Sequence, residues 1–153
     1  MTFAYDLRYA SDHFAGIGAH AHALLESLLE LPGDERYVVL WNPAWRNTRF
    51  DLDRNRAHPR VEWVERDYHP IHPWGAVRVG AWLRRLRPAA YLSPFSLRPF
   101  APGCPDVLTV FDVAPLRVRH SASAYLHLLY LLSLRHAVTA RRIVTGSEFS
   151  RRE

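Results

Sequence analysis

FAYDLRYASDHFAGIGAHAHALLESLLEL, residues 3–31, decides the fold of this chain. Phe3 to Tyr9 has the apolar, β-rich composition of a strand. Gly16 and Gly18 supply the conformational freedom for a sharp turn. Beyond the glycines, apolar residues recur at helical spacing on one face: Ile17, Ala21, Leu24, Leu25, Leu28 and Leu31. The stretch therefore predicts a strand, a glycine turn and a long amphipathic helix.

The predicted start of this helix is a candidate anion site. The first N–H groups of a helix lack partners within the helix, and its dipole favours negative charge at that end. Gly16, Ile17 and Gly18 would bring a phosphate close to those groups. The same glycines can equally serve only to close a strand-to-helix connection, and the stretch by itself leaves both interpretations open.

Length and composition indicate one globular domain in a reducing compartment. The chain has 153 residues, of which 48% are hydrophobic and 23% charged, which is typical of soluble proteins and excludes a disordered chain. No apolar run reaches the roughly 18 residues of a membrane span, and the N-terminus lacks the order of a secretory leader. Its one cysteine, Cys104, allows no internal disulfide. We therefore expect a cytoplasmic protein.

Strands and helices are predicted to alternate along the chain. Strands are expected at 3–9, 37–41, 61–64, 89–93, 106–111 and 142–145, and helices at 17–31, 74–87 and about 122–140. Residues 146–151 are expected to form a turn that begins a last helix. The segment 44–59 is expected to be a loop, and the helix near 122–140 to be buried on more than one side. The alternation predicts an α/β, Rossmann-like fold with a parallel sheet and helices on both faces.

Ligands bind such sheets at the carboxyl ends of the strands. Four stretches of interest fall there: 16–18, 93–96, 112–115 and 146–150. Asp112 can accept hydrogen bonds from a hydroxylated substrate or cap the following turn. Ser147 can cap the next helix and leave N–H groups for a phosphate, although capping needs no ligand.

Several other classes of function are disfavoured. Gly16 to Ala21 fits a relaxed dinucleotide pattern, but the glycines come well after the strand, and Trp41-Asn42 supplies no acidic residue for a ribose. The nine histidines form no metal-ligand pattern, so no metal is expected. No serine-hydrolase elbow or RNA-binding pattern occurs, and we expect no nucleic-acid partner. The arginine-rich helix 74–87 either contacts a membrane surface or presents a solvated face.

Four motifs, in order, carry a resemblance over essentially the whole chain. They are Asp6-x-Arg8, Gly16-Ile17-Gly18, Leu108-Thr-Val-Phe-Asp-Val-Ala-Pro-Leu116 and Ile143-Val-Thr-Gly-Ser-Glu-Phe-Ser-Arg151. Together they resemble the N-terminal domain of family 4 glycosyltransferases, which are retaining enzymes of the GT-B fold. The resemblance implies that this domain receives the acceptor, while a second Rossmann-like domain holds the nucleotide-diphosphate sugar.

The resemblance also implies site roles for particular residues. Gly16, Ile17 and Gly18 would contact the donor phosphates. The acceptor cleft would be lined by Arg8, Asp112, Ser147 and Glu148. Asp112 is the catalytic candidate, but many members have His where this chain has Phe111, so the catalytic residue is left unassigned. Transfer in this family needs no metal and no cofactor beyond the donor.

The resemblance further implies that the donor domain lies outside these 153 residues, because the chain ends inside the helix after the last motif. We expect sugar transfer to need that domain in cis or in trans, and the chain alone to be inactive. The acceptor would be a sugar or a lipid-linked glycan, with peripheral contact at the inner face of a membrane. The alternative is a non-catalytic binding or partner subunit, which Phe111 favours. If residues 125–138 normally pack against the missing elements, the isolated chain is expected to expose apolar surface there and to self-associate or dissolve poorly.

Overall fold

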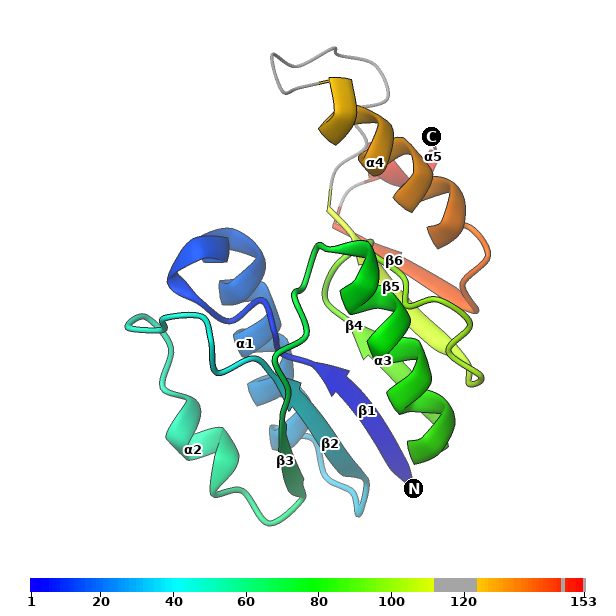
Figure 1. Cartoon of the computed structure of the whole chain (residues 1–153). Helices are drawn as coiled ribbons and strands as arrows, with labels where there is room; N and C mark the ends of the chain where they lie inside the picture. Colours follow the sequence, from blue (N-terminus) through cyan, green and yellow to red (C-terminus); the bar gives the residue numbers. More distant parts are fainter. Residues whose placement is uncertain (112–123, 147, 153) are drawn as a thin grey trace.

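The computed structural model describes residues 1–111, 124–146 and 148–152. Six strands form one all-parallel sheet in the order β3-β2-β1-β4-β5-β6 (Figure 1). The strands are β1 Thr2–Asp6, β2 Arg36–Trp41, β3 Val61–Glu65, β4 Ala90–Ser93, β5 Asp106–Val110 and β6 Arg142–Thr145. The Rossmann-like α/β fold predicted from the sequence is confirmed.

Helices cover both faces of the sheet (Figure 1). They are η1 Asp12–Phe14 (a 3₁₀ turn), α1 Ala15–Glu30, α2 Leu52–Arg56, α3 Pro73–Leu86, α4 Ala124–Ala137 and α5 Glu148–Arg152. Leu25 of α1 belongs to the same buried cluster as Tyr5 of β1. Leu83 of α3 belongs to a second cluster with Ala4, the preceding residue of β1. Successive side chains of a strand point to opposite faces, so α1 and α3 lie on opposite sides of β1.

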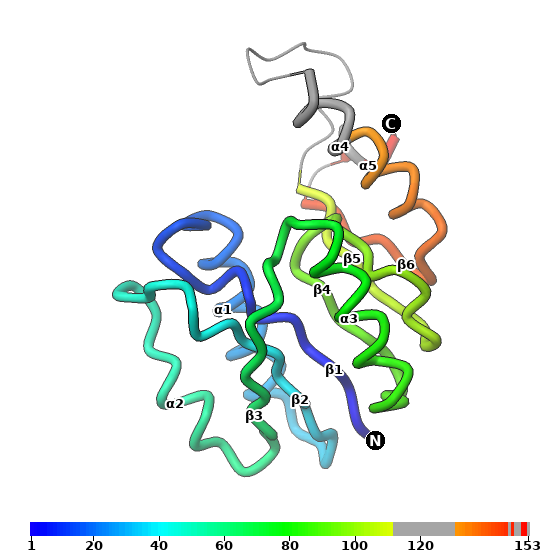
Figure 2. The backbone as a smooth tube through the Cα atoms, viewed as in Figure 1, coloured from blue at the N-terminus to red at the C-terminus, as the bar shows by residue number. Residues whose placement is uncertain are grey.

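The connection from β1 to α1 differs from the prediction. β1 ends at Asp6 rather than Tyr9, and the chain then turns through hydrogen bonds from Ala10 N–H to the Leu7 carbonyl (3.0 Å) and from Ser11 N–H to the Tyr9 carbonyl (2.8 Å). Figure 2 shows that this turn lies beyond the end of β1 and that the chain then enters α1.

The predicted glycine turn is wrong. Gly16 and Gly18 lie in the first turn of α1, and neither is among the described residues with positive φ. The turn is made upstream, by residues 7–11, without glycine.

Of two further segments, one differs from the prediction and one agrees with it. The expected loop 44–59 contains α2, which Asp51 caps by accepting a hydrogen bond from Asp53 N–H at 3.2 Å. The helix expected at 74–87 is confirmed as α3. His72 caps its start, Pro73 is its first residue, and the chain leaves it through Arg87 at φ 52°.

The expectation that the helix near 122–140 is buried on more than one side is wrong for the described side chains of α4. Leu132 is 51% exposed, whereas Ala137 is 1% exposed. Leu132 and Val138 therefore provide exposed apolar surface within residues 125–138, where it was expected, and Ile143 and Val144 of β6 add exposed apolar surface that was not predicted. Of the helices in the described ranges, none is long and apolar enough to cross a membrane.

Candidate functional site

The sheet order places a candidate site between β1 and β4. From β1 the chain proceeds to β2 and β3 on one side, and then crosses to β4, β5 and β6 on the other. In sheets of this kind ligands bind outside the carboxyl ends of the strands, at the point where the strand order reverses. Here that edge is formed by the turn after β1, the start of α1 and the residues after β4 and β5.

A buried ion pair between Arg8 and Asp6 lies beneath this edge of the sheet. Arg8 Nε donates to Asp6 Oδ1 at 2.8 Å, and Arg8 Nη2 donates to Asp6 Oδ2 at 2.7 Å. The hydroxyl of Tyr91 also donates to Asp6 Oδ2. Burial lowers the pKa of Arg8, but the carboxylate of Asp6 more than offsets this, so the pKa is raised and the guanidinium stays charged. The two charges compensate one another inside the fold.

The same arginine ties the loop before α3 to the sheet. Arg8 Nη1 donates to the carbonyls of Tyr68 at 3.2 Å and His69 at 3.4 Å. The hydroxyl of Tyr9 donates to the Pro70 carbonyl at 3.1 Å. Arg8 is only 3% exposed. The structure therefore places this predicted cleft residue beneath the edge, with its donors directed at protein acceptors.

The three predicted phosphate-contact residues have different surroundings. No side chain caps the start of α1, where Phe14 is the N-cap residue. A Cβ atom at Gly16 would meet nothing within 4 Å, so the first turn faces open space there. A Cβ atom at Gly18 would lie 2.6 Å from the Tyr9 carbonyl oxygen and 2.9 Å from the Phe50 ring. Gly16 is therefore accessible to a ligand, whereas Gly18 lets α1 pack closely; Ile17 is partly buried.

His20 lies one turn further along α1 and contacts the end of β5. Its ring is 4.8 Å from that of Phe111, edge to face. His20 Nε2 is buried and has no hydrogen-bond partner among the described residues, and burial lowers the pKa of this imidazole. A neutral imidazole can both donate and accept a hydrogen bond. His20 is not among the predicted site residues, because its only signal in the sequence is a position four residues after Gly16.

The remaining predicted residues lie elsewhere. Glu148 begins α5 and pairs with Arg151 and Arg152 of the same helix. Asp112 and Ser147 lie outside the described residues. The structure thus brings Gly16, His20 and Phe111 to one end of the sheet, and it gives Glu148 partners within its own helix.

Among the described residues, buried hydroxyl groups without partners lie at or after the ends of three strands. Ser11 Oγ follows β1, Ser96 Oγ follows β4 and Thr145 Oγ1 ends β6, and none has a hydrogen-bond partner in the described part of the chain. Buried polar groups normally have a partner. Over the same residues, no group of three or more His, Cys, Asp or Glu side chains could hold a metal ion.

No protein-family model, no curated protein and no solved structure matches this chain.

Proposed function

We propose that this chain is the acceptor-binding N-terminal domain of a retaining glycosyltransferase of the GT-B type, which uses a nucleotide-diphosphate sugar. The observation that carries the proposal is the start of α1 at the carboxyl edge of a parallel sheet, where no side chain caps the helix and Gly16 is exposed. A diphosphate placed there would accept hydrogen bonds from the first N–H groups of α1.

The proposed chemistry uses the charge that develops on the leaving group. As the bond to the sugar breaks, negative charge accumulates on the diphosphate, and fixed N–H donors and the helix dipole stabilise that charge. In the proposal, Gly16 and Ile17 supply these donors. His20 supplies an imidazole beside Phe111, near the position where many members of the resembled family have a histidine.

The other parts of the proposal follow from the resemblance. A second domain, in cis or in trans, holds the nucleotide. Asp112, Ser147 and Glu148 line the acceptor side, and the acceptor is a sugar or a lipid-linked glycan. The protein would act in the cytoplasm, with peripheral membrane contact. A non-catalytic binding subunit is the second candidate, because Phe111 replaces the usual histidine and Arg8 is occupied by Asp6.

Replacing Gly16 with aspartate tests the proposed phosphate site. We expect the Gly16→Asp variant to bind inorganic pyrophosphate, uridine diphosphate and guanosine diphosphate at least ~10-fold more weakly, a loss of about 1.4 kcal/mol. The new carboxylate would fill the open space and repel the phosphates. Aspartate in the first turn of a helix is also stabilising, so unfolding would not explain the loss. Isothermal titration calorimetry of the 153-residue chain measures the change.

The matched control is Ala23→Asp, which adds the same charge at an exposed position in the middle of α1. It should retain wild-type affinity. Equal binding by Gly16→Asp and Ala23→Asp, or no binding of any diphosphate by the wild-type chain, would contradict the proposed site.

A further inference from the structure

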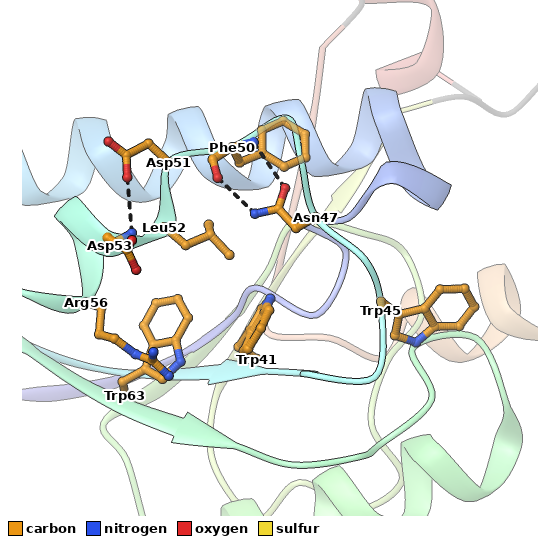
Figure 3. Close-up of a pocket in the computed structure, with 9 residues that line it drawn as sticks. All are labelled: Trp41, Trp45, Asn47, Phe50, Asp51, Leu52, Asp53, Arg56 and Trp63. Carbon is orange, nitrogen blue, oxygen red and sulfur yellow. Dashed lines mark hydrogen bonds between the residues drawn. The ribbon is translucent and has the colours of Figure 1, made fainter.

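A separate cavity lies between β2, β3 and the segment that leads into α2 (Figure 3). Its volume is about 280 Å³, just below the ~300 Å³ at which small-molecule pockets usually begin, so a ligand of one ring fits it. The lining residues are Trp41, Trp45, Asn47, Phe50, Asp51, Leu52, Asp53, Arg56 and Trp63.

Two tryptophans form one wall of this cavity. Trp41 ends β2, Trp63 lies in β3, and their ring centroids are 5.9 Å apart at an angle of 46°. Figure 3 shows Phe50 and Leu52 on the opposite side. The Phe50 ring stacks on His22 of α1 with a centroid distance of 5.6 Å, so this side is held by the long helix. Aromatic walls of this kind bind a ligand that has an apolar face.

Some polar groups of the cavity already make hydrogen bonds within the protein, and others have no partner among the residues that the structure describes. Asn47 closes its own loop, because its Nδ2 donates to the Phe50 carbonyl at 2.8 Å and its Oδ1 accepts from Phe50 N–H at 3.1 Å. Asp51 uses Oδ1 to cap α2. Within the described ranges, no hydrogen bond or ion pair engages Asp51 Oδ2 or the carboxylate of Asp53. Both carboxylates can therefore accept hydrogen bonds from hydroxyl groups.

Charge limits the class of ligand. The Arg56 guanidinium already lies over the Trp63 ring, 5.3 Å from its centroid, and it also pairs with Glu65. This arrangement disfavours a cationic ligand, because a cation already occupies that aromatic face. The two carboxylates disfavour an anion. The remaining class is a neutral ring that has an apolar face and hydroxyl donors.

We infer that this pocket binds a neutral saccharide, whose ring stacks on Trp41 and whose hydroxyl groups donate to the carboxylate of Asp53. The inference does not depend on the proposed phosphate site. Trp45, at one end of the cavity, also packs against His13, Phe14 and His69 near the end of β1. A glycan bound in the pocket could thus extend past Trp45 toward the sheet edge.

The test is a titration of the whole chain with methyl α-D-glucopyranoside, methyl β-D-galactopyranoside and N-acetylglucosamine. The indole N–H signals of the five tryptophans are followed by NMR. We expect the signals of Trp41 and Trp63 to shift with a dissociation constant on the order of 1 mM, while Trp74 and Trp82 stay in place. Trp41→Ala should weaken binding at least ~10-fold. Trp74→Ala, which removes an indole that is 67% exposed outside the pocket, should not.

Since Trp41 is partly buried, its loss could disturb the fold, and Asp53→Ala provides a second variant at an exposed position. It should remain folded and bind the saccharide several-fold more weakly. Absence of any saccharide-induced shift at Trp41 in the folded wild-type chain overturns the inference, and so do shifts caused only by choline or by sulfate. Neither result affects the diphosphate titration of Gly16→Asp, so the two proposals fail separately.

Discussion

Replacing Arg8 with methionine is expected to lower the free energy of unfolding by about 3–5 kcal/mol. Asp6, which is 0% exposed, would lose both guanidinium donors. The carbonyls of Tyr68 and His69 would lose a donor as well. A loss of this size is a large share of the stability of a typical domain. Urea denaturation followed by circular dichroism measures it.

Arg85→Met provides the control, because it makes the same substitution at an exposed position on α3. Its effect should stay within about 0.5 kcal/mol. The double variant Asp6→Asn/Arg8→Met should recover part of the loss, since it removes the uncompensated charge. Equal stability of Arg8→Met and Arg85→Met would contradict the buried ion pair.

Replacing Gly18 with alanine is expected to destabilise the fold by about 1–3 kcal/mol through overpacking. Alanine by itself favours a helix by up to ~1 kcal/mol over glycine, but here its methyl group would lie 2.6 Å from the Tyr9 carbonyl oxygen. Tyr9 and Ala10 are both 0% exposed, so the turn that they form has little room to move. Thermal unfolding of the purified variant measures the effect.

Gly16→Ala is the matched substitution, two residues earlier in the same helix. Its methyl group meets nothing within 4 Å, so the intrinsic helix preference should dominate and stability should rise by up to ~1 kcal/mol. If both variants change stability in the same direction by the same amount, α1 does not pack closely on the turn after β1.

The layered fold could be predicted from the sequence because its strands are short apolar runs separated by helical periodicity. Residues 37–41 and 106–110 are clear examples. Each of these strands pairs in parallel with one neighbouring strand on either side. Ala4 packs on the face covered by α3 and Tyr5 on the face covered by α1, because successive side chains of a strand point to opposite faces.

The details around the site could be predicted less well, since they depend on contacts between distant residues. The two glycines suggested a turn, but Gly18 is required by its approach to Tyr9 and Phe50, which the local sequence does not reveal. The local sequence did not indicate that Arg8 would be buried in an ion pair with Asp6, or that Tyr91 would donate to the same carboxylate. Only α2 had an overlooked local signal, the capping residue Asp51.

The position of His20 against Phe111 could not be anticipated either. The two residues are 91 positions apart, and they meet because the first part of α1 and the end of β5 lie at the same edge of the sheet. Contacts between such distant residues depend on the order of the strands in the sheet. An alternation of strands and helices along the chain does not by itself specify that order.

We propose that the first turn of α1 binds a diphosphate. The most direct measurement is a ¹H–¹⁵N correlation spectrum of the labelled wild-type chain, recorded with increasing inorganic pyrophosphate and then uridine diphosphate. We predict that the largest amide shifts occur at Gly16 and Ile17 and saturate with both ligands. Shifts that are largest on the exposed arginine-rich end of α3, around Arg84 and Arg85, or that do not saturate at any residue, would contradict the claim.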